Sequence, residues 1–330
     1  MMLSPIAIDS GRLSRLRHGA VMIRAPVSVI EVQGPGALAC LQGVLTNDLV
    51  KPGDGSFVYS ATLTPKGMII ADMWVLRVST QRLLLIGDPA AHQSTLGVLR
   101  RSMPARMALV NDLSEGREAL WLCGDLAIVS LAAAGLAVPD GDSRAVLQGA
   151  GAEASVLARP HAAAPFRAVL VGNSALIDQA ERALGNAGAL PGDLDDLEAS
   201  RILSGWPRLG AEIQEKTLPQ EVRYDDIQGL SYTKGCYTGQ ETVARLHFRG
   251  HTNRELRGLI WSGVPALSGD EVVGAEGEAV GTIGSLLVLP QVTAGLAVLR
   301  RQIEVGNLVT AAGHEASVVA LPFDAASLHD

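Results

Sequence analysis

The chain changes character after Thr252. From there onward, short apolar segments with alternating side chains are separated by glycine and proline turns. Closely spaced strands with short connections predict an all-β barrel or sandwich that stands apart from the rest of the chain. We therefore expect residues 251–330 to form a small C-terminal β-barrel domain. Its strands are predicted at 255–261, 271–273, 279–288, 295–299, 308–310 and 316–320.

Residues 1–250 show a different pattern, in which strands alternate with helices. A hairpin is predicted at 57–63 and 68–78, because Thr64-Pro65-Lys66-Gly67 has the composition of a tight turn. An amphipathic helix follows at 89–101. The pattern then repeats, with strands near 119–123, 144–157 and 168–171 and helices at 125–136, 174–188 and 195–204. Such a sequence is typical of an α+β fold with mainly antiparallel sheets.

Composition and charge exclude several classes of protein. Of the 330 residues, 48% are hydrophobic but only 4% are aromatic, so aliphatic side chains must fill most of the core. No apolar run approaches the roughly 20 residues that span a bilayer, and no apolar signal core opens the chain. We therefore expect a cytoplasmic protein without membrane contact. A net charge of -7 also predicts that the chain does not bind tRNA strongly.

The three cysteines, Cys40, Cys123 and Cys236, are odd in number and far apart. This spacing excludes a disulfide framework and offers no C-x-x-C metal pair. His247 and His251 lie four residues apart, but Gly250 is expected to end the helix between them. Without a third ligand nearby, solvent-facing histidines are favoured over a metal site.

The stretch 234–241, Lys-Gly-Cys-Tyr-Thr-Gly-Gln-Glu, places Cys236 in a glycine-flanked turn before a predicted helix. Thr238 and Glu241 have the spacing of a capping box, so Thr238 is the expected N-cap. The helix dipole and the adjacent Lys234 would both favour a thiolate at Cys236. The alternative is a buried structural cysteine, which is the more common fate of a lone cysteine.

The octet resembles the hallmark of the YgfZ family, K-G-C-Y/F-x-G-Q-E, and the resemblance spans most of residues 25–262. That family in turn resembles the T-protein of the glycine cleavage system, a folate-dependent aminomethyltransferase. The resemblance implies a three-part ring around a central folate pocket, made of two interleaved α+β units and the C-terminal barrel. The two units would comprise about 1–50 with 115–210 and about 51–114 with 211–250. Further matching segments are 41–48, 65–67, 201–207, 218–221, 229–233, 244–245, 249–251 and Arg254.

The resemblance also implies a function and a set of site residues. Members of the family assemble or repair iron–sulfur clusters, notably in four-iron and radical-SAM enzymes, some of which modify tRNA. Cys236, helped by Lys234, would be the reactive residue and would hold a cluster only jointly with an iron–sulfur carrier or scaffold protein. Tetrahydrofolate or a derivative would occupy the pocket. The remaining motif residues are Gly235, Tyr237, Gly239, Gln240, Glu241 and Arg245, and the expected pocket residues are Asn47, Asp48, Lys66, Asp72 and Arg201.

Several of these residues have more specific expected roles or plain structural alternatives. Gly235 and Gly239 would let the backbone approach a ligand closely. The side chains of Gln240 and Glu241 would orient the loop, although Glu241 could serve only as a cap. Asn47 and Asp48 could simply stabilise a turn, and Arg201 could pair with a surface acid.

Two departures from the T-protein pattern bear on activity. The adjacent acids that follow its hairpin turn align with Ala71 and Asp72, which puts alanine at the catalytic position. Its pterin-contacting glutamate aligns with Leu203. Both changes argue against aminomethyl transfer. A folate-dependent one-carbon transferase is therefore the first alternative to cluster assembly. A tRNA-binding module is the second, using Arg245, Arg249, Arg254 and Arg257.

Overall fold

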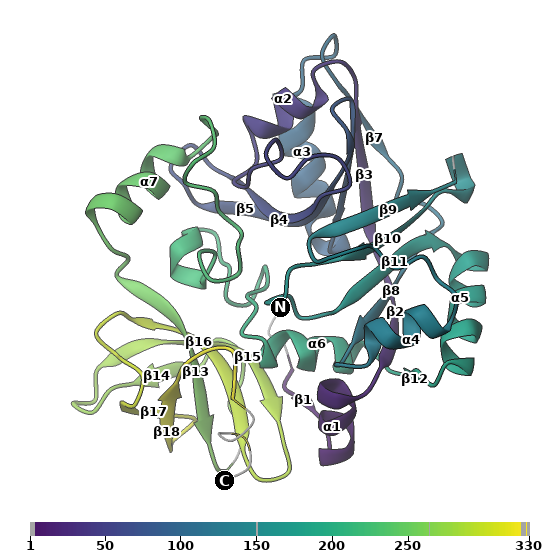
Figure 1. Cartoon of the computed structure of the whole chain (residues 1–330). Coiled ribbons are helices and arrows are strands. Elements are labelled where there is room, and N and C mark those ends of the chain that lie inside the picture. The colour runs from purple at the N-terminus through teal and green to yellow at the C-terminus, as the bar shows by residue number, and fades with distance from the viewer. Residues whose placement is uncertain (1–3, 150, 264, 325–327, 329–330) are drawn as a thin grey trace.

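Two sheets and a closed barrel surround a centre that is crossed by the long loop between α6 and α7 (Figure 1). The structure is a computed structural model that describes residues 4–149, 151–263, 265–324 and 328. None of the helices in this described part combines the length and the apolar character that a bilayer-spanning segment requires.

The first unit contains a five-stranded antiparallel sheet in the order β4-β5-β6-β3-β7. Helices α2 (Ala37–Gln42) and α3 (His92–Ser102) cover its outer face, where Leu41, Leu96 and Leu99 pack against the aliphatic side chains of the strands. The strands are β3 (Ser28–Gln33), β4 (Phe57–Leu63), β5 (Ile69–Ser79), β6 (Arg82–Gly87) and β7 (Leu109–Asp112).

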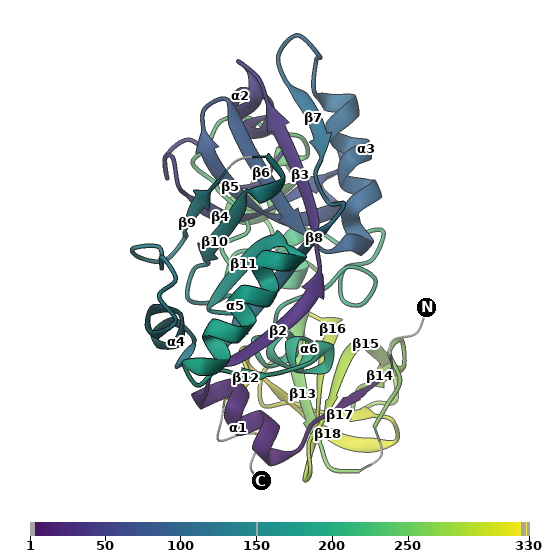
Figure 2. The same cartoon turned by 90° about the vertical axis from the view of Figure 1, so that its right-hand side faces the viewer.

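The second unit contains a six-stranded sheet in the order β12-β2-β8-β11-β10-β9. Helices α4 (Ala127–Ala133) and α5 (Ser174–Asn186) pack on its outer face, and Figure 2 shows α5 lying along it. The strands are β2 (Val21–Pro26), β8 (Arg117–Cys123), β9 (Arg144–Gln148), β10 (Ser155–Arg159), β11 (Ala168–Asn173) and β12 (Leu190–Pro191). Elsewhere in the described residues, the remaining helices are α1 (Ser10–His18), α6 (Leu194–Leu203) and α7 (Gln240–Arg249), and the 3-10 turns are η1 (Pro89–Ala91), η2 (Gly151–Glu153) and η3 (Pro219–Val222).

The C-terminal strands form a barrel, which closes because β15 pairs with both β14 and β16. The order around it is β15-β14-β17-β18-β13-β16. The short N-terminal strand β1 (Ile6–Ala7) runs parallel to β15 at its edge, with Ile6 opposite Leu287. The barrel strands are β13 (Arg254–Trp261), β14 (Glu271–Val273), β15 (Ala279–Val288), β16 (Thr293–Arg300), β17 (Leu308–Ala311) and β18 (His314–Val319).

The chain first crosses between the two units at Val27, rather than near residue 50 as the sequence-based boundary places it. Pro26 pairs with Glu118 in the six-stranded sheet, whereas Ser28 pairs with Gly87 in the five-stranded sheet. Val27 itself is buried in the shared core. The extended backbone passes from one sheet to the next without a turn, and Pro26 beside the crossing still fits that extended conformation. Residues 28–50 therefore belong with the hairpin.

The inner faces of both sheets meet in one central core, where the few aromatic side chains gather. Phe57 stacks on Trp74 with ring centroids 5.0 Å apart, and Trp74 stacks on Trp206 at 5.8 Å. The edge of Tyr59 meets Trp206 at 4.6 Å. Aliphatic residues thus fill most of the outer cores, while most of the aromatic rings lie in the centre of the molecule.

Candidate functional site

A cavity of about 420 Å³ opens beside this aromatic cluster. Its walls come from β4, β5, β8, α6 and the segment after α6, so both α+β units contribute to it. The volume is in the range of small-molecule sites. Its aromatic lining consists of Tyr59, Trp74, Trp121, Phe166 and Trp206, and its charged lining includes Asp72, Asp88, Glu198, Arg201 and Arg208.

Strand β5 places Asp72 in the cavity and directs its neighbour Ala71 away from it. Side chains alternate along a strand, so Ala71 packs in the outer core under the helices. The hydroxyls of Tyr59 and Tyr224 donate to Asp72 Oδ2 at 2.7 and 3.1 Å. Burial raises the pKa of Asp72 above its usual range. The cavity face of β5 therefore carries a carboxyl group, that of Asp72, although position 71 is alanine.

Arg201 is buried in an ion-pair network between α6 and the barrel. Its guanidinium donates to both carboxylate oxygens of Glu198, at 2.7 and 2.8 Å, and to Glu212 Oε2 at 3.3 Å. It also donates to Ser285 Oγ on β15. Burial alone would lower the pKa of Arg201, but the carboxylates of Glu212 and Glu198 outweigh it and raise this pKa. Arg201 thus pairs with the fully buried Glu212 and the half-buried Glu198 rather than with a surface acid.

Glu198 is a cavity residue that the sequence analysis missed. It precedes Arg201 by three residues on α6, and this i,i+3 spacing is the signal that could have identified it. Burial opposes ionisation of Glu198, but the hydrogen bond from Arg201 lowers its pKa below the usual value. Leu203, where the T-protein pattern has its glutamate, packs against the central core instead. The carboxylate that reaches the cavity is therefore that of Glu198, five residues before Leu203 in the helix.

Cys236 lies elsewhere, in an exposed loop between the centre and α7 (Gln240–Arg249). The loop is anchored by Lys234, whose ammonium group donates to the carbonyl oxygens of Leu45 and Asn47 at 2.5 and 2.9 Å. It also lies 4.9 Å from the ring centre of the buried Tyr237. Burial lowers the pKa of Lys234 to about 8. Lys234 thus fixes the loop through the 45–47 segment while Cys236 remains accessible.

The predicted pocket residues Asn47, Asp48 and Lys66 are not part of the lining of this cavity. Asn47 Nδ2 donates to the carbonyl oxygens of Tyr59 and Gln228, so its side chain stabilises the platform beneath the Cys236 loop. Asp48 accepts hydrogen bonds from the backbone amides at 50 and 51, as a turn residue does. Lys66 is exposed in the hairpin turn.

The prediction that Thr238 and Glu241 form a capping box at the start of α7 is wrong. The N-cap of α7 is Gly239, without a side-chain cap, and Thr238 is exposed. Gly239 has φ of +84°, and a Cβ there would lie 2.6 Å from the carbonyl oxygen of Thr64. The close approach of the hairpin turn therefore requires glycine at this position. A Cβ at position 235 would meet no atom within 4 Å beyond its chain neighbours, so nothing in the chain itself requires glycine there.

The side chains of Gln240 and Glu241 make no hydrogen bond within the described residues, contrary to their predicted role in orienting the loop. Nor do three or more histidine, cysteine, aspartate or glutamate side chains come together as a metal site in that part of the chain. Cys123 is buried and Cys40 half-buried, so Cys236 is the accessible thiol.

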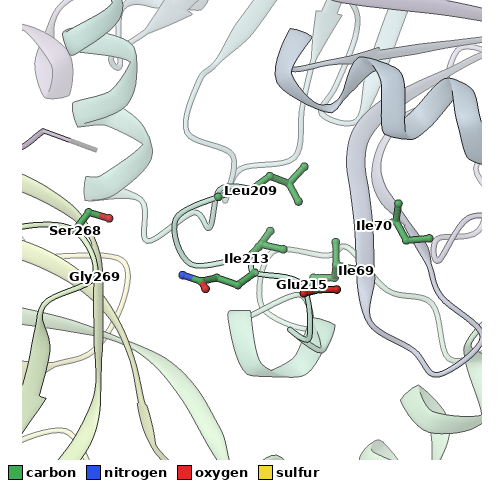
Figure 3. Close-up of a pocket in the computed structure, with 9 residues that line it drawn as sticks. Ile69, Ile70, Leu209, Ile213, Glu215, Ser268 and Gly269 are labelled. Carbon is green, nitrogen blue, oxygen red and sulfur yellow. The ribbon is translucent and has the colours of Figure 1, made fainter. Parts of the chain in front are cut away.

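A second cavity, of about 550 Å³, lies at the seam between the hairpin and the barrel (Figure 3). Ile69 and Ile70 face it from β5, and Ser268 and Gly269 from a barrel turn, with the loop carrying Ile213 between them. None of the predicted site residues lies there.

Comparison with known proteins agrees with this architecture. The GCVT N-terminal domain model matches residues 17–139. The solved aminomethyltransferase T of the glycine cleavage system from Bartonella henselae superposes with a TM-score of 0.81 at 20% identity, covering 95% of this chain and 89% of that one. The fold and cavity thus define a protein with the architecture of aminomethyltransferase T, as the sequence predicts.

Two curated relatives are more similar in sequence. The tRNA-modifying protein YgfZ of Edwardsiella ictaluri (strain 93-146) is 31% identical over 69% of this chain and 66% of that protein. The protein of the same name from Serratia proteamaculans (strain 568) is 28% identical over 69% of this chain and 67% of its own length. The chain thus spans just under two thirds of the Edwardsiella relative. It belongs to the YgfZ family.

Proposed function

We propose that the protein supports tRNA modification by assembling or repairing the iron–sulfur clusters of four-iron enzymes, with Cys236 as the thiol that contacts the cluster. The observation that carries the proposal is an exposed cysteine on a loop whose two neighbouring side chains, Lys234 and Tyr237, are buried. Such a thiol is presented to a partner at a fixed position. A single cysteine cannot complete a cluster site, so the partner must supply the other ligands.

The test is complementation of a bacterial strain that lacks its own YgfZ-family protein. We expect Cys236→Ser to lower the tRNA modification made by a four-iron enzyme by about tenfold or more, because a hydroxyl is a poor ligand for iron. Cys40→Ser is the matched control, since Cys40 lies half-buried on α2, and it should complement fully. Full complementation by Cys236→Ser, with equal protein levels, would show that the thiol is not used.

We also propose that the central cavity binds a reduced folate, which would supply a carrier for one-carbon units. Tyr59, Trp74 and Trp206 give the cavity an aromatic lining suited to a ring system, and Glu198 offers carboxylate oxygens to its amino groups. The indole N–H of Trp121, also in the lining, is buried without a hydrogen-bond partner among the described residues. These groups fit a ligand that combines an aromatic ring with hydrogen-bond acceptors.

Titration with tetrahydrofolate tests this proposal, because three of the lining residues are tryptophans whose fluorescence a bound ring will quench. We expect saturable quenching with a Kd at or below the micromolar range. Glu198→Gln should weaken binding by about tenfold, whereas Glu181→Gln, which alters another arginine-paired glutamate outside the cavity, should not. Quenching that fails to saturate at millimolar ligand would contradict a folate site.

A further inference from the structure

Helix α7 presents a face that is exposed in the described part of the chain. Val243 is its buried residue, and Thr242, Ala244 and Leu246 are half-buried. Residues 241, 245, 248 and 249 follow a spacing of four, seven and eight, so they share the opposite face, and all are exposed. Figure 1 shows α7 at the outer edge of the ring, between the five-stranded sheet and the barrel. The α7 surface is defined here as Arg245, Phe248 and Arg249.

Phe248 is the most exposed large apolar side chain in the described part of the chain, at 67%. It is nevertheless held in place by neighbouring rings. The edge of Phe248 meets the His247 ring at 4.7 Å, and His247 stacks on Tyr232 at 3.6 Å. The Tyr232 hydroxyl in turn donates to Asp225. A braced aromatic ring loses little freedom on binding, which is the property of an anchor residue at an interface.

Arg245 and Arg249 flank this ring. Their guanidinium groups make no hydrogen bond or ion pair within the described residues. They differ in this from the two arginines that follow. Arg254 is paired with Glu221 at 3.0 Å, and Arg257 is paired with Glu255. Arg245 and Arg249 outnumber the one exposed carboxylate of that face, Glu241, so in a chain with a net charge of -7 they leave local positive charge beside an exposed aromatic ring for a partner to neutralise.

The surface also lies close to the accessible thiol. Cys236 precedes the first residue of α7 by four positions, and Phe248 lies about 12 Å along the helix from Gln240 at 1.5 Å per residue. A partner that contacts both would cover the exposed face of a single helix. We infer that the α7 surface docks an acidic protein segment of the iron–sulfur partner and so brings that partner's cluster to Cys236. This inference rests on the function proposed for Cys236.

The charges favour a protein segment over RNA. Following a phosphate backbone requires a row of cations, and the pairing of Arg254 and Arg257 leaves only Arg245 and Arg249 of the four predicted phosphate contacts. The overall negative charge of the chain also repels a long polyanion. One aromatic anchor flanked by two arginines is instead the composition of a small protein–protein hot spot.

Photocrosslinking in the complementation strain tests the inference. A benzoylphenylalanine placed at position 248 should form an adduct that resists ribonuclease, is destroyed by protease and contains an iron–sulfur protein by mass spectrometry. Arg245→Glu/Arg249→Glu should abolish the adduct and lower tRNA modification by about tenfold, because acidic side chains now face an acidic partner. Arg100→Glu/Arg101→Glu changes the charge equally on the exposed end of α3 and should leave both unchanged.

The truncation Phe248→Ala should lower modification, and Val129→Ala, which removes an equally exposed side chain from α4, should not. An adduct sensitive to ribonuclease would make RNA the occupant and overturn the inference. So would full activity of the charge-reversal variant with no adduct at position 248. Cys236→Ser in the same strain separates the two proposals. If it lowers modification while the α7 variants do not, only the docking surface is wrong.

Discussion

Arg201→Met is expected to lower the free energy of unfolding by about 3–5 kcal/mol, the cost of leaving a buried charge without its partner. The side chain of Glu212 is fully buried, and its carboxylate faces Arg201 at 3.3 Å. Methionine fills a similar volume but cannot donate a hydrogen bond. The backbone amides of Arg208 and Ser285 still donate to Glu212, but they do not neutralise it. Denaturant titration followed by tryptophan fluorescence measures the change.

Two comparisons show whether charge is the cause. In the double variant Arg201→Met/Glu212→Gln the buried carboxylate is gone, so part of the lost stability should return. Arg24→Met removes ion pairs with Glu118, Asp178 and Glu181, whose side chains are about one third to one half exposed, and it should cost less, about 1 kcal/mol. If the loss of stability for Arg201→Met is no larger than that for Arg24→Met, the buried network contributes no more stability than exposed ion pairs do, which would contradict this prediction.

Acid is expected to destabilise the protein through His161. This side chain is 5% exposed and packs against both Trp74 and Trp206, at 5.5 and 5.8 Å from their ring centres. Burial lowers its pKa to about 4 from the usual 6.5, against a smaller opposing effect of Asp142. Below pH 6.5 the unfolded chain binds a proton that the folded chain does not, so stability falls as the pH falls towards 4. The loss is at most about 3 kcal/mol.

His161→Phe keeps a ring against the two tryptophans and removes the titrating group. Its free energy of unfolding should therefore vary less between pH 6.5 and 4 than that of the natural chain. Replacing the exposed His251 by glutamine should leave the pH profile as it was. Denaturant titrations at a series of pH values measure all three, and parallel profiles for His161→Phe and the natural chain would exclude His161 as the cause.

The elements that the sequence predicts well are those whose signals are local. The hairpin of β4 and β5 was predicted within a residue or so, because both strands alternate and the turn between them has a distinct composition. Helix α1 was missed because its sequence is mostly polar, with only Leu13 and Leu16 buried. The crossing at Val27 was missed because Pro26 fits extended backbone and the segments on both sides of it have the pattern of one continuous strand.

The candidate site divides along the same line. The exposure of Cys236 follows from its glycine-rich surroundings, which the sequence contains. The partners of Lys234 cannot be predicted in this way, because Leu45 and Asn47 are far from it in sequence and approach it only in the folded chain. The N-cap of α7 depends on how closely the hairpin turn approaches Gly239, which is again a distant contact. Motif residues can therefore be recognised in the sequence, whereas their assignment to the loop or to the cavity requires the structure.

The pairing of β1 with β15 sets the order in which this contact can form during synthesis. Ile6 and its partner Leu287 are far apart in the sequence, so Ile6 leaves the ribosome long before Leu287. The hairpin and both sheets can form in the interval, because all their strands lie before residue 192. Strand β1 must wait for β15, so the contact that joins them forms only after the strands of both sheets have been synthesised.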